Sequence, residues 1–403
     1  MIIKTRPNTV MSSKNAVTIG KLIQKCLKKA YFLPQKPSSY SKGYRFLNDK
    51  KYRVYDCPPS SLSFDRLLSP FRHLPAAGNE VPIIMECQPQ SYLQEHWRQW
   101  LPAFPPVVIK PLDEGLQDDV PIVTTAALQN IPEHKHSIHP DLLYKLQLKS
   151  SILEVGVPFP RHMDINSISY PCAVKADMST GGRGSWLVKN ASDLSAALHE
   201  IRDVCGWKDG IVFQEYIPGV NEVPSFQFYL HKSGELFWVG TTSGGFNGFA
   251  WTSGTVDWDK QEGYKNLVYD EFTLPIKNYL HNRGYFGLVT FEVLIMDHGN
   301  YLVDINPRIG GDTTHLLLAR YMALDIGLKQ SAIFCKNKHA DNMTAKMLVE
   351  VANNNNIKSE GRTVVLSATD SDKGCESYVS IFAKTQEEVQ DLFHLLNVTS
   401  KIF

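Results

Sequence analysis

The chain has 403 residues, of which 43% are hydrophobic and 21% charged, and its formal net charge is +1 at pH 7. This composition is ordinary for a folded protein, and no apolar run approaches the roughly 18 residues that a membrane-spanning helix needs. Fibrous, disordered and membrane-spanning classes are thereby excluded, and the length predicts two or three domains.

Positive charge is concentrated in the first 48 residues, which hold eight Lys and two Arg without any Asp or Glu, so the rest carries a net −9. Such a start is found in organelle transit peptides, nucleic-acid-binding arms and helices that lie on anionic lipid. We expect instead a first helix packed on its own domain, because one face is apolar and apolar sequence follows. That face holds Ile19, Leu22, Ile23, Cys26 and Leu27. The prediction is a cytoplasmic protein without a nucleic-acid partner, with organelle targeting left open.

Residues 1–140 are expected to form an α/β domain with this basic leading segment. Residues 81–86 and 122–126 have the composition of strands, and residues 90–101 have a helical pattern. Prolines interrupt the other segments, so the strand order cannot be traced. Three histidines precede Pro140, and a polar loop is favoured over a metal site there. They are His134, His136 and His139.

Two lysines stand out in the middle of the chain. Lys145 lies in a helical stretch that ends before a Gly156-Val-Pro turn, and a solvated helix face is the usual place for such a residue. Lys175 lies in a short apolar strand, where a buried ammonium group has no structural purpose.

A glycine-rich turn follows Lys175. It contains Gly181, Gly182, Arg183 and Gly184. Bare backbone N–H groups in such a turn can close over phosphates. The lysine precedes the glycines, unlike a Walker motif, and a strand-like segment follows them, unlike a Rossmann fingerprint. An ordinary turn is the alternative.

The strand-like residues 211–217 run into Pro218-Gly219. Main-chain groups near Glu215, Tyr216 and Ile217 could supply the donor and the acceptor that adenine needs, and Glu222 could hold ribose hydroxyls. A plain strand and turn fits this segment equally well.

Residues 241–254, rich in glycine, hydroxyl and aromatic groups, are expected to form a loop that closes over a small substrate. The candidate contacts are Trp251, Thr252, Ser253 and Gly254, with Gly310, Gly311 and Asp312 further along. A surface loop without such a role is the alternative.

Two apolar runs, 286–296 and 301–305, flank the polar turn 298–300 and predict a β-hairpin. Because side chains alternate along a strand, Asp304 and Asn306 share a face that Glu292 can meet across the ladder. Two carboxylates and an amide suit Mg²⁺ or Mn²⁺. Arg308 suits a phosphate or carboxylate oxygen. A surface hairpin with ordinary turn chemistry is the alternative.

The expected domains are 1–140, 141–335 and 336–403, with the middle one divided into a lid at 158–220 and a catalytic lobe at 221–335. In the lid, residues 192–204 are predicted to be helical with Ser192 as the N-cap. The last domain is predicted to be α/β, with strands at 363–368 and 378–383 and a helix over 385–396. Residues 353–356, four asparagines, are predicted to be a loop.

Seven cysteines are scattered without a C-x-x-C pair, so metal–thiolate and redox motifs lack support. Their odd number, without a signal peptide, favours a reducing compartment.

The order of four segments resembles the ATP-grasp superfamily over about residues 145–315. In that family a lysine lies eleven residues before Gly-Val-Pro, as Lys145 does, and a second lysine precedes a glycine-rich flap, as Lys175 does. A Glu-Tyr-Ile-x-Gly hinge matches Glu215 to Gly219. The final segment, an acidic pair with Asn-Pro-Arg, matches Glu292, Asp304, Asn306 and Arg308.

The resemblance implies an α/β protein in which an N-terminal domain precedes a two-lobed ATP-grasp domain and a small C-terminal extension. It implies a ligase that uses ATP to activate a small carboxylate as an acyl phosphate, which an amine captures with release of ADP and phosphate. The implied nucleotide contacts are Lys145, Lys175, the flap 181–184, the hinge 215–217, Glu222 and Glu292. The implied metal ligands are Glu292, Asp304 and Asn306, and Arg308 and Lys175 are the implied catalytic residues.

Three departures bear on these expectations. Tyr144 stands where an Asp often precedes the first lysine, Asp304 replaces the more frequent Glu, and the segment from Gly219 to Glu222 is one residue longer than usual. Activation of bicarbonate, as in biotin carboxylases, and a non-catalytic ATP-binding module are the alternatives. The sequence leaves open the acid, the amine, the role of the basic start and the oligomeric state, a homodimer included.

Overall fold

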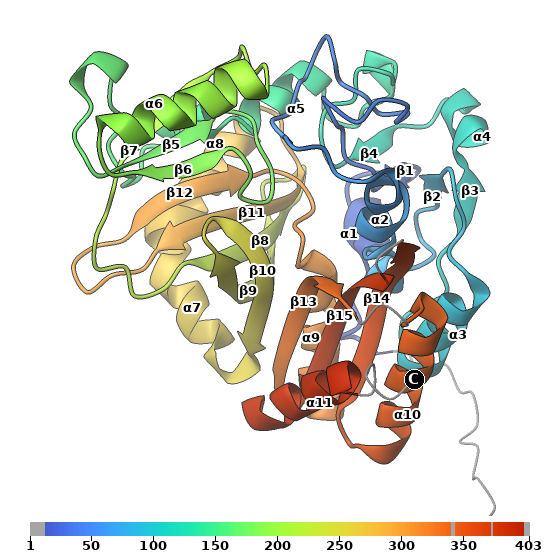
Figure 1. The fold of residues 1–403 in the computed structure, drawn as a ribbon. Coiled ribbons are helices and arrows are strands. Elements are labelled where there is room, and N and C mark those ends of the chain that lie inside the picture. The colour runs from blue at the N-terminus through green and yellow to red at the C-terminus, as the bar shows by residue number, and fades with distance from the viewer. Residues whose placement is uncertain (1–12, 340–342, 372–373, 399–403) are drawn as a thin grey trace, which may run out of the picture.

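The computed structural model describes residues 13–339, 343–371 and 374–398, which build three β-sheets with helices on their faces (Figure 1). A parallel sheet has the order β3 (Ile109–Pro111), β2 (Ile83–Met85), β1 (Tyr31–Leu33), β4 (Ile122–Thr124). A three-stranded antiparallel sheet has the order β6 (Ser185–Val188), β5 (Cys172–Ala176), β7 (Ile211–Glu215). A large antiparallel sheet has the order β12 (Tyr301–Asn306), β11 (Gly287–Leu294), β8 (Pro224–Leu230), β9 (Leu236–Asn247), β10 (Ala250–Asp257), β13 (Gln330–Lys338), β15 (Gly374–Ala383), β14 (Arg362–Ser371). The predicted mixed α/β fold is confirmed.

The helices connect and cover these sheets. They are α1 (Ile19–Gln24), α2 (Ser69–Phe71), α3 (Ser91–Trp100), α4 (Leu112–Gln117), α5 (Pro140–Leu146), α6 (Ala191–His199), α7 (Gln261–Val268), α8 (Leu274–His281), α9 (Thr313–Tyr321), α10 (Ala345–Lys358) and α11 (Gln386–Val398). A short 3-10 segment, η4 (Lys149–Glu154), follows α5. None of the described helices is long and apolar enough to cross a membrane.

Within the described part of the basic segment, from residue 13 onwards, the expected first helix is present and packs through its apolar face. The side chain of Thr18 caps α1, and Ile19, Leu22 and Ile23 are buried. The chain then enters β1, which pairs in parallel with β2 and β4. Lys21, the lysine of α1, therefore belongs to a folded element with an apolar face.

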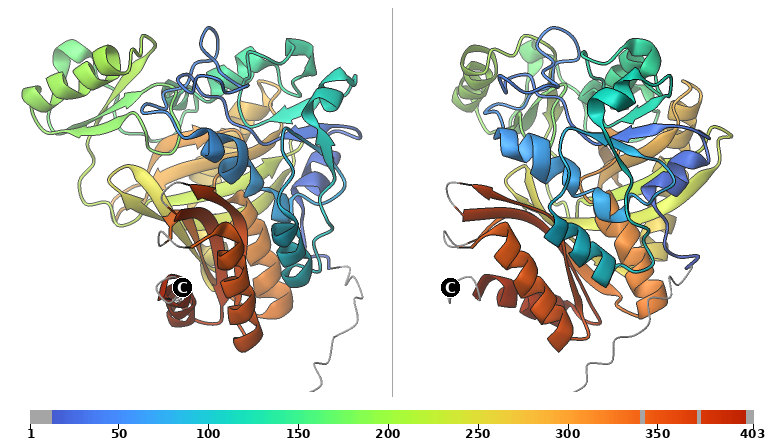
Figure 2. Two further views of the ribbon diagram at one scale, coloured as in Figure 1. Left: turned by 45° about the vertical axis from the view of Figure 1, so that its right-hand side comes forward. Right: turned by 90° about the vertical axis from the view of Figure 1, so that its right-hand side faces the viewer.

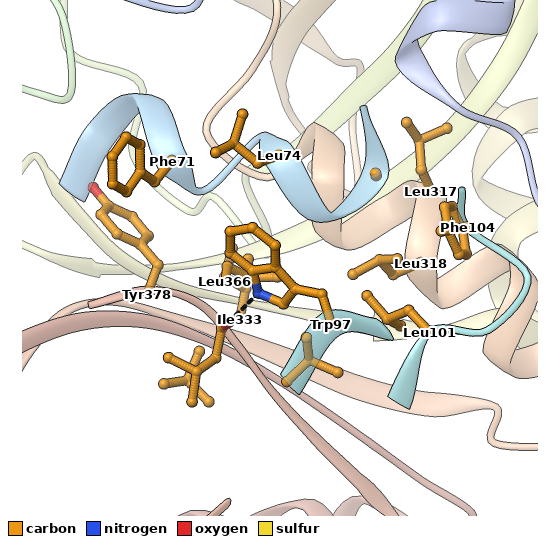
Figure 3. Close-up of a cluster of buried hydrophobic side chains, with 14 of the residues drawn as sticks. Phe71, Leu74, Trp97, Leu101, Phe104, Leu317, Leu318, Ile333, Leu366 and Tyr378 are labelled. Carbon is orange, nitrogen blue, oxygen red and sulfur yellow. Dashed lines mark hydrogen bonds between the residues drawn. The ribbon is translucent and has the colours of Figure 1, made fainter. Parts of the chain in front are cut away.

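One hydrophobic core joins the N-terminal part, α9 and the last strands (Figure 3). Phe71, Leu74 and Trp97 pack with Leu318 and Leu366 there, and the Trp97 indole N–H donates to the Val365 carbonyl at 2.8 Å. Strands β13, β15 and β14 continue the large sheet, so the residues after 335 share both sheet and core with the preceding part. The domain boundaries stay predictions.

Two local predictions are wrong, and both concern asparagine. The four asparagines at 353–356 lie inside α10, because the Asn356 side chain bonds the Thr363 backbone in both directions and so offsets a weak helix propensity. Helix α6 begins at Ala191 rather than after Ser192, because the side chain of Asn190 accepts the N-cap hydrogen bond from Asp193.

Residues 241–254 also differ from expectation, because they form most of a β-hairpin rather than a loop. Strands β9 and β10 pair around a turn at 248–249. Their glycines let the strands and side chains approach closely, since a Cβ at Gly245 would lie 2.2 Å from the Ser253 hydroxyl oxygen.

The three-stranded sheet and α6 lie at the top of the molecule in both views of Figure 2. Residues 53–60 fasten this unit to the N-terminal part, because the Tyr55 N–H donates to the Met178 carbonyl at 2.7 Å and a disulfide joins Cys57 to Cys205. The two cysteines are 148 residues apart, so their spacing in the sequence does not reveal the pair.

Candidate functional site

The predicted hairpin is present and brings four of the predicted residues together. Strands β11 and β12 pair antiparallel, with Glu292 directly opposite Asp304. The Asn306 amide donates to Asp304 Oδ2 at 3.0 Å, and the Arg308 guanidinium donates to Asn306 Oδ1 at 2.7 Å. The alternation of side chains along the strands accounts for this arrangement.

Lys149, which the sequence analysis missed, completes this cluster. Its Nζ lies 2.5 Å from Asp304 Oδ2, and the two side chains are only 10% and 16% exposed. The Lys149 N–H donates to the carbonyl of Asp177, and the Ser150 hydroxyl donates to the Asp177 carboxylate. Segment η4 is therefore held between the end of the lid strand β5 and the strand β12.

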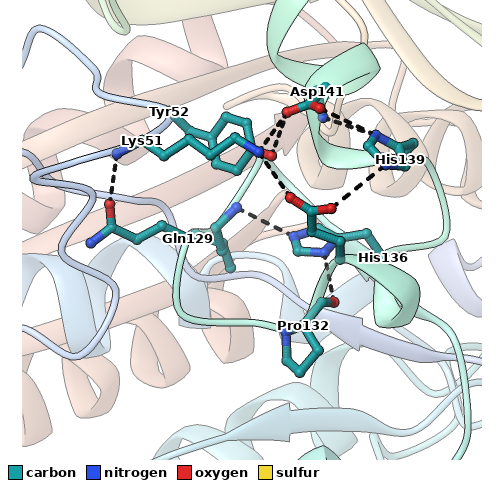
Figure 4. A network of polar contacts seen from close by, with 9 residues as sticks. Lys51, Tyr52, Gln129, Pro132, His136, His139 and Asp141 are labelled. Carbon is teal, nitrogen blue, oxygen red and sulfur yellow. Dashed lines mark hydrogen bonds and ion pairs between the residues drawn. The ribbon is translucent and has the colours of Figure 1, made fainter.

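Lys145 points elsewhere. Its side chain is 59% exposed, and its Nζ lies 3.3 Å from Glu154 Oε1. The start of α5 is fixed by Asp141, which accepts from the Tyr52 hydroxyl and pairs with Lys51 (Figure 4). With that anchor, the predicted nucleotide lysine lies on the solvent side of the helix.

No periodicity in the sequence separates Lys149 from Lys145. The two residues are four positions apart and would share a face of one continuous α-helix. The structure instead ends α5 at Leu146 and begins the 3-10 segment η4 at Lys149, and this break lets the two side chains point in different directions.

Lys175 lies on β5, the central strand of the three-stranded sheet, and adds a second ammonium group near the two carboxylates of the hairpin. Burial lowers the pKa of Lys175 to about 8; the nearby Asp304 opposes that shift, and the charge of Lys149 adds to it. Burial makes the charged form of a lysine less favourable, and an anion beside the ammonium group offsets that effect.

The pKa values of the two carboxylates of the hairpin are shifted in opposite directions. Burial, together with the charge of Asp304, raises the pKa of Glu292 to about 7. Burial would also raise the pKa of Asp304, but Lys149 holds it below its usual value. Asp304 Oδ1 is buried and has no hydrogen-bond partner. A buried carboxylate oxygen without a partner is costly unless a ligand uses it.

These oxygens fit a hard cation. Two carboxylates and one amide are the ligands that Mg²⁺ accepts alongside phosphate oxygens and water. Among residues 13–339, 343–371 and 374–398, no group of three or more His, Cys, Asp or Glu side chains forms a metal site. The histidines before Pro140 fit the predicted polar loop, since His136 accepts from the Leu128 N–H.

The glycine-rich turn lies against the tip of the β9–β10 hairpin. Gly181, Gly182 and Gly184 all have positive φ, and a Cβ at Gly182 would lie 1.8 Å from the Phe249 carbonyl oxygen. Arg183 points towards residues 56–58, because its guanidinium donates to the carbonyls of Asp56 and Pro58. Arg183 therefore anchors the turn, and contact between the turn backbone and a ligand stays a prediction.

The predicted hinge is arranged around Glu222. Its carboxylate accepts from the Tyr264 hydroxyl at 2.7 Å and from Ser243, and its backbone pairs with Ile295 at the end of β11. Glu215 accepts from the Arg161 N–H, and Tyr216 is exposed. Ile217 follows as part of the same connection, outside any strand.

The candidate substrate residues divide into two groups. Trp251 covers Gly311, since its ring lies 2.7 Å from where a Cβ would be, and Gly310 packs on Thr290 beside Arg308. By contrast Ser253 and Gly254 lie within the strand pairing, where a Cβ at Gly254 would meet Thr242.

The comparisons with known proteins agree with the geometry. Residues 144–312 match the family model of the ATP-grasp domain. No curated protein sequence matches the chain.

Three similar solved structures cover most of the chain. N5-carboxyaminoimidazole synthetase from Staphylococcus aureus, complexed with ADP, has 13% identity and a TM-score of 0.53, covering 92% of this chain and 98% of its own. L-amino acid ligase from Bacillus licheniformis has 13% identity and a TM-score of 0.52, covering 92% and 97%. N5-carboxyaminoimidazole synthase from Aspergillus clavatus, in complex with ADP and 5-aminoimidazole ribonucleotide, has 12% identity and a TM-score of 0.51, covering 80% and 92%. The predicted resemblance is confirmed.

Proposed function

Because residues 144–312 form an ATP-grasp domain, we propose that the chain is an ATP-dependent ligase that activates a small carboxylate as an acyl phosphate and joins it to an amine. ADP and phosphate are the other products. The observation that carries the proposal is the largely buried cluster of Lys149, Lys175, Glu292 and Asp304, in which Asp304 Oδ1 has no partner.

In this proposal the triphosphate lies between the lid and the hairpin. Lys175 and Lys149 offset its charge, and backbone N–H groups of the turn 181–184 contact its oxygens. Glu222 holds the ribose, and the backbone near Ile217 receives the base. Lys145 remains a nucleotide contact only by resemblance, since its side chain pairs with Glu154.

Glu292, Asp304 and Asn306 would hold Mg²⁺, or Mn²⁺. A bound divalent cation neutralises charge on the transferring phosphoryl group. The protein's part is to orient ATP and, through Lys149, to keep Asp304 ionised.

The substrate carboxylate, paired with Arg308, attacks the γ-phosphorus, and the bond to the bridging oxygen breaks so that ADP leaves with the electron pair. The amine nitrogen then attacks the acyl carbon, phosphate leaves, and the nitrogen loses a proton. Orientation and charge stabilisation account for the rate in such a reaction, and no protein nucleophile is required.

The test is ADP formation by the full chain with Mg²⁺, ATP and a matrix of amino acids and other small carboxylates and amines, alongside direct titration of ATP. We expect ATP to bind, and ADP to form only when an acid and an amine are both present. Absence of ATP binding, or ADP formation with bicarbonate and biotin in place of the acid and amine, would contradict the proposal.

A further inference from the structure

Arg72 is a buried cation that has no role in the proposed reaction. It follows the short helix α2 and is only 2% exposed. Its neighbours Phe71 and Leu74 are buried in the shared hydrophobic core (Figure 3), so the backbone that carries Arg72 is fixed from both sides.

No carboxylate forms an ion pair with Arg72 in the part of the chain that the structure describes, although the charge of Arg72 acts on the buried Asp312 and opposes the rise in its pKa that burial causes. Its Nη2 is buried without a hydrogen-bond partner, its Nε lies 3.2 Å from His73 Nε2, and its guanidinium lies over the Tyr378 ring at 4.9 Å. An aromatic face compensates a buried charge only in part, and burying an unpaired cation is strongly unfavourable. Asp312 compensates this charge only from beyond ion-pair distance, and the Nη2 group remains without a partner, which an anion could supply.

The surroundings of Arg72 place it beside the proposed active site. His73 Nδ1 lies 3.4 Å from the Thr314 hydroxyl on α9, the helix that begins directly after Gly310, Gly311 and Asp312. The charge of Arg72 also acts on Arg308, whose pKa is lowered by burial and by that charge. The guanidinium groups of Arg72 and Arg308 thus act on one another from different parts of the chain, and Arg72 forms no ion pair of its own among the described residues.

We infer that Arg72 binds an anionic group of a substrate, a carboxylate or a phosphate, distinct from the carboxylate that reacts at Arg308. The inference rests on the proposed ligase function. It narrows the substrates to a pair with one anionic group beyond the reacting one, such as an amino acid or a phosphorylated amine as the nucleophile, or a dicarboxylic acid. An uncharged simple amine joined to a monocarboxylic acid does not use Arg72.

The experiment titrates inorganic phosphate and, separately, malonate into the full chain with Mg²⁺ and the non-hydrolysable nucleotide AMP-PNP present. It compares the unaltered protein with Arg72→Met and with Arg98→Met, an exposed arginine on α3 that controls for net charge. We expect at least one probe to bind, about ten-fold or more weaker in Arg72→Met and unchanged in Arg98→Met. Failure of both probes to bind the unaltered protein, or equal binding by Arg72→Met, overturns the inference.

Stability measurements separate binding from a purely structural role. A residue that holds the core together loses stability when replaced, whereas an unpaired buried charge gives a protein as stable or more stable when replaced by an apolar side chain. We expect the urea midpoint of Arg72→Met, without anions, to match or exceed that of the unaltered protein. A large fall in the midpoint would assign Arg72 to the core and overturn the inference. Arg72→Lys, which keeps the charge but not the planar fork, should bind the probe with intermediate affinity.

AMP-PNP binding is recorded for each protein in the same series. Arg72 does not contact the proposed nucleotide site, so this affinity should be equal in all variants. Loss of nucleotide binding by the unaltered protein would refute the proposed function, whereas normal nucleotide binding with no effect of Arg72→Met on the probes would refute only the role of Arg72.

Discussion

The β11–β12 hairpin and the glycine-rich turn 181–184 both carry an arginine beside glycine or asparagine, yet their polar groups are arranged in opposite ways. In the hairpin Asp304 Oδ1 is buried without a partner, and burial raises the pKa of Glu292. In the turn, Arg183 donates to two carbonyls and to the Ser60 hydroxyl. One region keeps polar groups available for a ligand, and the other uses them to hold the lid.

This difference predicts different consequences of substitution. Unpaired polar groups at a site lower stability and serve function, so changes there should reduce activity more than stability. Fully bonded contacts between the lid and residues 53–60 should show the reverse. Substitutions in the two regions test that division.

Asp304→Asn should lower ADP formation by about 10³-fold or more. The substitution removes the charge of one side chain that both binds the proposed cation and pairs with Lys149. The loss of stability should be only about 1–2 kcal/mol, less than for most buried pairs, because Glu292 then ionises and faces Lys149. Steady-state kinetics and urea unfolding measure the two effects.

Asp259→Asn is the matched control, since Asp259 forms an ion pair with Lys329 at the surface. It should change neither quantity beyond error. ADP formation by Asp304→Asn at a rate close to that of the unaltered protein would remove the hairpin from the proposed mechanism.

Cys57→Ser tests the second region. Loss of a cross-link that closes a loop of 148 residues should lower the free energy of unfolding by about 2–4 kcal/mol, while ADP formation in the absence of urea stays within about two-fold. Urea unfolding without a reductant is the measurement.

Cys26→Ser, at a free cysteine, controls for loss of a thiol. Equal unfolding midpoints for the two variants would mean that the disulfide does not hold the lid.

The elements that sequence reasoning found share a local origin. The hairpin followed from alternation within 20 residues, and that alternation also placed Glu292 opposite Asp304. Strands β5 and β7 followed from short apolar runs, and helix α3 followed from a helical pattern; these elements have 5, 5 and 10 residues.

What sequence reasoning missed depends on contacts between distant residues. Lys149 meets Asp304 from 155 positions away, and Cys57 meets Cys205 from 148. Arg72 lies in a segment without clear periodicity, and its burial follows from a core that unites three parts of the chain. The choice of Lys145 over Lys149 shows that family spacing alone does not reveal the break between α5 and η4, which separates the two side chains.

Comparison of the two lysines gives a third prediction. Lys149→Met should weaken ATP binding by about ten-fold, because the ammonium beside Asp304 is lost from the phosphate site. Lys145→Met should change it by less than about two-fold, because Lys145 is exposed and its pair with Glu154 is at the surface. Titration with AMP-PNP measures both. A larger effect at Lys145 would mean that this side chain leaves Glu154 when the nucleotide binds, and that the family spacing identifies the right lysine.

The smallest expected effect is a dependence of nucleotide affinity on pH. The pKa of Lys175 is lowered to about 8, so above that value the lysine is neutral in the free protein and must take up a proton to pair with phosphate. Affinity for AMP-PNP should therefore fall about three-fold between pH 7.5 and 8.5.

Stability without nucleotide should change in the opposite direction. A lysine whose pKa is lower in the folded protein than in the unfolded chain makes folding more favourable as pH rises from about 8 towards the ordinary value near 10.5. Lys175→Met should remove both dependences, whereas Lys189→Met, at an exposed lysine that follows β6, should keep them. If the affinity of Lys175→Met falls with pH as steeply as that of the unaltered protein, another group provides the charge, and the lid strand does not contact the phosphates.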